Sequence, residues 1–130
     1  MADGSINFGL LTRFTNEVRR YGAGDPIFAK GEPGYELFVV KAGEVELRDG
    51  ERVLQTVGVG GLFGEMALID ASPRSAAAFA RTELEIVPLT EKQFVYLIAE
   101  MPYFALNVMR VLVGRLRTAT RQLPPGETPV

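Results

Sequence analysis

The side chains best suited to chemistry lie together between Phe63 and Ala76, where an acid and an arginine flank a short turn. The stretch reads Phe-Gly-Glu-Met-Ala-Leu-Ile-Asp-Ala-Ser-Pro-Arg-Ser-Ala. Gly64 lets the chain turn without a Cβ clash, and Met66 to Leu68 favour one helical turn that has to end before Pro73. The unpaired N–H groups of such a turn attract a small anion, so the stretch predicts an anion site.

The charged residues of this stretch define the anion further. Arg74 offers a planar fork for two oxygens of one phosphate, while Ser75 and Ala76 can add a hydroxyl and a backbone N–H. An acid beside a phosphate is useful only if the ligand also carries hydroxyl donors, and Glu65 could accept from a ribose 2′-OH. The pattern therefore predicts a ligand that has a sugar and one phosphate close together.

In order and spacing, the stretch resembles the phosphate-binding cassette of cyclic nucleotide-binding domains. The cassette pattern is Phe-Gly-Glu, small and apolar residues, a spacer, and then Pro-Arg-Ser/Thr/Ala-Ala. The resemblance implies that Glu65 binds the ribose 2′-OH and Arg74 the cyclic phosphate. It also implies that Ser75 faces the phosphate or the base edge, and that Thr120 on a later helix reaches the base. The implied ligand-binding residues are Phe63, Gly64, Glu65, Met66, Ala67, Arg74, Ser75, Ala76 and Thr120.

A structural alternative needs no ligand. Glu65 and Arg74 could form an ordinary ion pair across a turn, with the glycines as loop residues. A Gly-Glu dipeptide alone would favour this alternative, because short motifs occur by chance. The whole cassette, in order and at family spacing, favours a binding pocket instead.

The composition excludes several kinds of active site. The 130 residues are enough for one domain with a single core, and 47% of them are hydrophobic. The chain has no cysteine and no histidine, so we expect neither a disulfide, nor a metal, nor histidine-based catalysis. A cupin-like metalloenzyme barrel is set aside for the same reason. Together with the resemblance to cyclic nucleotide-binding domains, this leads us to expect a protein that is not an enzyme.

Charge and hydropathy limit the partners and the location. The formal net charge of −2 gives no general attraction to nucleic acid. Residues 1–10 lack the basic and apolar pattern of a secretory signal, and no run of about eighteen apolar residues suggests a membrane segment. We expect a cytoplasmic location and no membrane partner.

The pattern of short segments places the cassette in a β-rich domain. Apolar residues at near-helical spacing predict a short N-terminal helix over 6–17. From Val18 to Leu89, strand-like segments alternate with Gly and Pro, and Asp49-Gly50 predicts a hairpin turn with positive φ at both residues. Residues 31–43 also resemble the β-roll of the same family. The predicted fold is mainly β with flanking helices: a double-stranded β-helix, or jelly-roll-like β-roll, with one short N-terminal and two C-terminal helices.

Two helices follow the strands. Thr90 is expected to cap the first, and Pro102 begins a longer one that reaches about Leu123. We expect one domain over 1–123, with the β-roll at 18–89 and the helices at 90–123, and a flexible tail at 124–130. The arginines at 110, 115, 117 and 121 are interpreted as a solvated basic face. One of these guanidiniums could cap a bound purine.

The long helix also carries a heptad seam, which leaves two hypotheses open. It could be a core helix that touches only its own barrel, or it could pair with a second copy to form a homodimer. The seam residues named for the homodimer are Met109, Leu112, Leu116, Ala119 and Leu123.

Taken together, these patterns and the family resemblance imply a cyclic nucleotide sensor, and the resemblance to the bacterial cyclic-AMP-receptor branch implies that its C-terminal helix closes over the ligand. Cyclic AMP is preferred over cyclic GMP, because Ser75 and the long helix resemble the bacterial cyclic-AMP-receptor branch. The alternative is a ligand-free β-roll that works as a dimerisation or protein-interaction module. No residues follow the long helix that could form a helix-turn-helix, so we expect no direct DNA binding and an effector protein of unknown identity.

Overall fold

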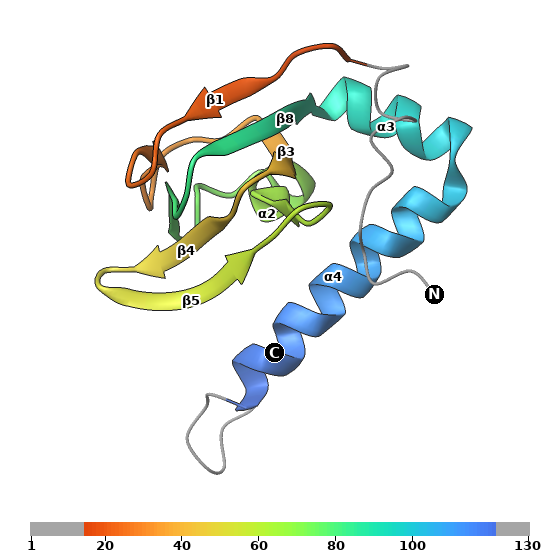
Figure 1. The fold of residues 1–130 in the computed structure, drawn as a ribbon. Coiled ribbons are helices and arrows are strands. Elements are labelled where there is room, and N and C mark those ends of the chain that lie inside the picture. Colours follow the sequence, from red (N-terminus) through yellow and green to blue (C-terminus); the bar gives the residue numbers. More distant parts are fainter. Residues whose placement is uncertain (1–14, 122–130) are drawn as a thin grey trace.

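Two antiparallel sheets form the body of the molecule. The structure is a computed structural model that describes residues 15–121, with side chains described up to residue 117. Within these residues, eight strands form two four-stranded sheets in the orders β1-β8-β3-β6 and β2-β7-β4-β5 (Figure 1). This β-roll confirms the predicted fold class. The strands are β1 (Arg19–Tyr21), β2 (Pro26–Phe28), β3 (Glu36–Ala42), β4 (Val45–Asp49), β5 (Arg52–Val57), β6 (Leu62–Phe63), β7 (Ala77–Ala80) and β8 (Leu84–Thr90).

Strand β3 separates two hydrophobic cores. Its residues alternate between the two faces of the sheet. Leu37 and Val39 pack toward the helices, while Phe38 and Val40 pack into the space between the two sheets. Because both faces of β3 are covered, the sequence shows a continuous apolar run here instead of alternation.

The hairpin between β4 and β5 differs from its prediction. Asp49 pairs with Arg52, so Gly50 and Glu51 are the two turn residues. Of Asp49 and Gly50, only Gly50 has a positive φ, at 62°, so the prediction of positive φ at both was wrong. The reason is a register shift between Leu47 and Arg48, which keeps Asp49 in the strand.

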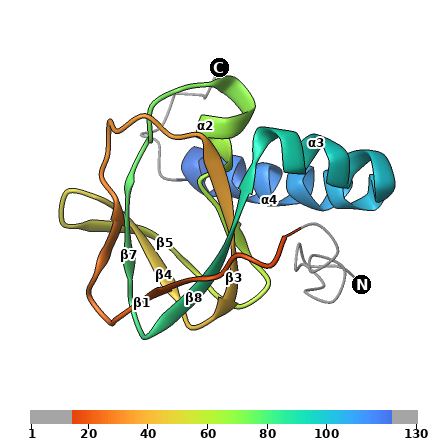
Figure 2. The ribbon, with the colours of Figure 1, turned by 90° about the horizontal axis from the view of Figure 1, so that it is seen from above.

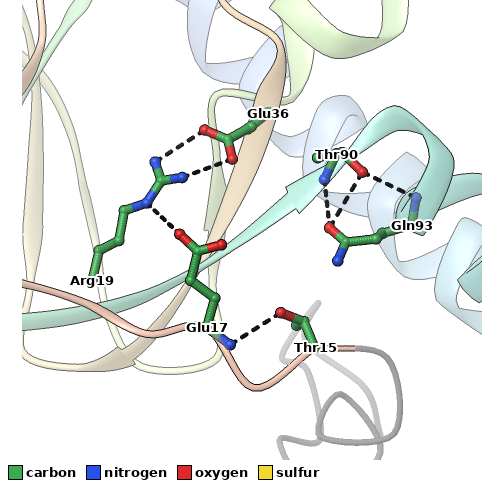
Figure 3. A network of polar contacts seen from close by, with 6 residues as sticks. All are labelled: Thr15, Glu17, Arg19, Glu36, Thr90 and Gln93. Carbon is green, nitrogen blue, oxygen red and sulfur yellow. Dashed lines mark hydrogen bonds and ion pairs between the residues drawn. The ribbon is translucent and has the colours of Figure 1, made fainter.

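Three helices complete the described fold. Helix α2 (Glu65–Asp70) follows β6 and is longer than the single turn predicted for the cassette. Helix α3 (Glu91–Glu100) begins at Thr90, whose hydroxyl accepts from Gln93 N while Gln93 Oε1 accepts from Thr90 N at 2.9 Å (Figure 3). This capping box confirms the predicted N-cap. Helix α4 (Pro102–Arg121) starts at Pro102 as expected.

Helix α4 runs along the roll after a bend of 118° from α3. Figure 2 shows α3 and α4 lying side by side at one flank of the sheets. Phe104 and Val108 are buried in the core beneath the helices, and Leu112 packs against it, whereas Met109 is 54% exposed. The predicted seam is therefore divided between the roll and solvent. The side chains of Ala119 and Leu123 lie outside the described part.

Two further expectations concern the ends and the hydropathy of the chain. Residues 15–17 are not helical, and the rest of the predicted N-terminal helix, like the predicted tail at 124–130, lies outside the described residues. Within the described residues no single helix is long and apolar enough to cross a membrane, although α3 and α4 taken together would pass by length and composition.

Candidate functional site

The cassette residues surround a cavity of about 350 Å³ between the roll and the C-terminal helix. Strand β5 and helix α4 contribute Gln55 and Arg115 to its wall. Phe63, also predicted for the site, is fully buried in the core between the sheets. The side chain of Thr120 lies outside the described part of the chain. The predicted site residues that line the cavity are Gly64, Glu65, Met66, Ala67, Arg74, Ser75 and Ala76.

Arg74 is held in the cavity wall by backbone and aromatic contacts. Arg74 is only 6% exposed, and its Nη1 donates a hydrogen bond to the carbonyl oxygen of Gly64 at 2.9 Å. Its guanidinium carbon lies 4.3 Å from the ring centre of Phe28, a cation–π distance. A Cβ on Gly34 would overlap Arg74 Nε, and one on Gly64 would lie 2.7 Å from Nη1. The two glycines are therefore needed because the guanidinium lies against their backbone.

The charge of Arg74 is not neutralised by a neighbouring acid. No carboxylate within the described residues lies at ion-pair distance from it, so the ion pair with Glu65 that the structural alternative required is not formed. Burial lowers the pKa of Arg74, and the charges of Glu36 and then Glu32 oppose this shift. An arginine remains protonated at neutral pH, so this guanidinium can bind an anion.

Glu65 is almost fully buried, at 2% exposure, and faces the same cavity. It begins α2, and one carboxylate oxygen, Oε2, accepts from the backbone N–H of Met66 at 3.2 Å. The other oxygen, Oε1, forms an ion pair with Arg115 of helix α4. The acid predicted to hold a sugar hydroxyl is thus also the contact between the cassette and the C-terminal helix.

Arg115 is the functional residue that sequence reasoning did not single out. Its Nε donates to Gln55 Oε1 at 2.9 Å, its Nη2 donates to the carbonyl oxygen of Leu62, and its side chain is only 18% exposed. Burial lowers its pKa to about 10, which leaves it charged at neutral pH. The interpretation of Arg115 as part of a solvated face was wrong. It follows Val111 and Leu112 by four and three residues, and this helical spacing from packed positions could have revealed it.

The rest of the cavity wall is partly polar and partly apolar. Ser75 is exposed, and its hydroxyl lies 3.8 Å from the sulfur of Met66. Leu47 and Leu54 give the wall an apolar part. Within the part of the chain that the structure describes, no group of three or more acidic, cysteine or histidine side chains is placed to hold a metal ion. The site combines the buried guanidinium of Arg74, the ion pair of Glu65 with Arg115 and an apolar surface.

Comparison with known proteins gives a consistent result. A family model described as the cyclic nucleotide-binding domain matches residues 18–101. The cyclic AMP receptor protein of Thermus thermophilus is 39% identical over 110 residues, which cover 81% of this chain and 51% of that protein. A CRP-like cAMP-activated global transcriptional regulator of Mycobacterium tuberculosis is 33% identical over 105 residues, covering 77% of this chain and 47% of that protein.

A solved structure supports the same relation. The crystal structure of the Thermus thermophilus catabolite activator protein superposes with a TM-score of 0.76 at 36% identity, covering 86% of this chain and 55% of that one. The chain spans about half the length of the curated relatives it matches. The family model itself extends from before β1 to the end of α3, so it includes the whole cassette.

The contact between Glu65 and Arg115 makes a prediction about stability. Changing Arg115→Met keeps much of the side-chain volume but leaves the buried acid without its cation, so we expect the free energy of unfolding to fall by about 2 to 4 kcal/mol. Urea unfolding at pH 7 measures this change. The matched control is Arg117→Met, two residues along the same helix, where the side chain is exposed. Equal unfolding midpoints for the two variants would contradict the prediction.

Proposed function

The chain belongs to the cyclic nucleotide-binding domain family, and we propose that it is a regulatory sensor module that binds one cyclic nucleotide in this cavity and catalyses no reaction. The carrying observation is the position of Arg74: a buried guanidinium without an acid partner within the described residues lines the same cavity as a buried carboxylate. An anion that also carries a hydroxyl donor satisfies both groups.

In the proposed complex, the cyclic phosphate lies on Arg74 and the ribose lies toward Glu65. The backbone N–H groups of Ala67 and Ala76 and the hydroxyl of Ser75 are the further donors for the phosphate, and all three residues line the cavity. The ribose 2′-OH donates to the Glu65 carboxylate. Phe63, which is buried behind the cavity, supports the cassette from the core instead of contacting the ligand.

Helix α4 is the element that senses the ligand in this proposal. Arg115 ties the helix to Glu65, so a ribose that contacts the carboxylate changes the environment of the ion pair. A ligand shifts the position of a helix only by as much as its affinity differs between the two positions. The contact of Thr120 with the base stays a prediction. The cytoplasmic location also stays a prediction.

We further propose that cyclic AMP is preferred over cyclic GMP. Two observations support this preference: the cassette has Ser75 after its arginine, and the relatives from Thermus thermophilus and Mycobacterium tuberculosis carry cyclic AMP in their names. The hydroxyl of Ser75 could also serve cyclic GMP, which is why the two nucleotides have to be compared directly.

A second copy of the chain is the proposed partner of α4. Met109, Val113 and Leu116 are exposed along this helix, while Phe104 and Val108 face the roll. The apolar surface therefore continues beyond the side that the roll covers, as in a helix that packs on two neighbours. Leu112 belongs to the core side, and the predicted contribution of Ala119 and Leu123 stays a prediction.

The role of Arg74 can be tested by removing its side chain. Charge-assisted hydrogen bonds contribute about 1.5 to 3 kcal/mol each, so Arg74→Ala should weaken cyclic nucleotide binding by roughly a hundredfold or more. Isothermal titration calorimetry measures the affinity. The control is Arg81→Ala, which removes an exposed arginine that is ion-paired with Glu44 outside the cavity. Unchanged affinity in Arg74→Ala would remove this residue from the site.

The nucleotide preference requires a paired titration of the unmodified protein. We expect tighter binding of cyclic AMP than of cyclic GMP, because similar relatives carry cyclic AMP in their names and the cassette has Ser75 after its arginine. Tighter binding of cyclic GMP would overturn only the preference.

A ligand at a hundred times its dissociation constant adds about 2.7 kcal/mol of stability. No thermal shift with either nucleotide at millimolar concentration would instead support the ligand-free interaction module.

The proposed dimer has its own test. Val113→Glu places a charge on the exposed side of α4 and should convert a dimer into a monomer, as measured by sedimentation equilibrium with and without cyclic AMP. The control is Val95→Glu on α3, where valine is also exposed, at 59%. A wild-type protein that is monomeric at every concentration, or a Val113→Glu variant that stays dimeric, contradicts the proposed interface.

A further inference from the structure

Glu36, at the start of β3, is held by an arginine outside the cavity. Arg19 of β1 donates from Nη1 to Glu36 Oε1 at 3.0 Å and from Nη2 to Glu36 Oε2 at 2.9 Å. Its Nε donates to Glu17 Oε2 at 2.9 Å, as Figure 3 shows. The hydrogen bonds that Arg19 donates to Glu36 are the largest cause of its raised pKa. Both oxygens of Glu36 are therefore engaged by one planar guanidinium.

The backbone of Glu36 lies near the cavity arginine. The guanidinium carbons of Arg19 and Arg74 lie 5.9 and 5.5 Å from the centre of the Phe38 ring, two residues after Glu36 on the same side of β3. A Cβ on Gly64 would lie 3.5 Å from the carbonyl oxygen of Glu36 and 2.7 Å from Arg74 Nη1. The backbone of Glu36 therefore lies beside Gly64, whose carbonyl oxygen accepts a hydrogen bond from Arg74.

The charges follow this geometry. Glu36 is the acid that most raises the pKa of Arg74 against the effect of burial, ahead of Glu32. Nevertheless, its carboxylate pairs with Arg19. A carboxylate that turned to Arg74 would occupy the guanidinium that the proposed function assigns to the phosphate.

We propose that Arg19 is a positioning residue for the anion site: by holding both oxygens of Glu36, it prevents this acid from neutralising Arg74 or repelling an anionic ligand. The inference rests on the proposed function, because the anion concerned is the phosphate of the cyclic nucleotide. Two effects have the same sign when Arg19 is removed. Glu36 loses its bidentate partner and can turn toward Arg74, and its uncompensated charge opposes the anion even if it does not move.

Arg19 lies on a short strand at the edge of its sheet. β1 has three residues, and within the described part of the chain β8 is the one strand that pairs with it. Short edge strands open at lower free energy than central strands. Opening of β1 would therefore separate Arg19 from Glu36.

The first arm of the test removes the positioning residue. Arg19→Ala should weaken cyclic AMP binding by about three- to tenfold in calorimetric titration at low salt. The matched control is Arg20→Ala, which removes the same charge from the next residue of β1, where the side chain pairs with Glu85. The control should change the affinity much less. Equal affinities for the two variants would overturn the inference.

The second arm separates this role from a structural one. In a Glu36→Gln background the acid that Arg19 restrains is absent, so adding Arg19→Ala should leave the affinity nearly unchanged. A damaged fold, or a general loss of positive charge, would lower the affinity equally in both backgrounds and overturn the inference. Absence of binding by the wild-type protein would instead overturn the proposed function, and the inference with it.

Discussion

The buried charge of Arg74 is the constraint on which the site depends. A guanidinium removed from water costs free energy unless other groups replace its hydration. Here the carbonyl of Gly64 and the rings of Phe28 and Phe38 do so only in part, because none of them is an anion. Because Gly34 has no side chain, it leaves space for the guanidinium of Arg74. The roll thus holds a buried positive charge that has no acid partner among the described residues.

The second constraint is the ion pair between Glu65 and Arg115. It joins the start of α2 to α4, and Arg115 also bonds Gln55 in β5, 60 residues earlier in the chain. Three elements that are distant in the sequence therefore share one polar cluster at the cavity. Since a buried acid must keep a cation or a hydrogen-bond donor, moving α4 away from the roll would leave Glu65 without its cation.

Short-range chemistry was predictable from the chain alone. The cassette between Phe63 and Ala76 has its glycine, acid and arginine at fixed spacing, and its ligand class follows from donors and acceptors that are local. The N-cap at Thr90 depends on a residue only three positions away, and the apolar run at Leu37 to Val40 reports burial on both faces of one strand. In each case the cause lies within a few residues, so the sequence contains it.

The sequence by itself determined the fold class, the cassette and the family, because these depend on local spacing and on periodicity. Only the tertiary structure decided which charges meet. Nothing local assigns Arg115 to Glu65 or Arg19 to Glu36. The first pairing requires the 118° bend before α4 and the packing of α4 on the roll. The second requires the register of β1 and β3 on either side of β8. The hairpin at Asp49 differed for the same reason. The pairing of β4 with β5 contains a register shift, and this shift moves the turn by one residue.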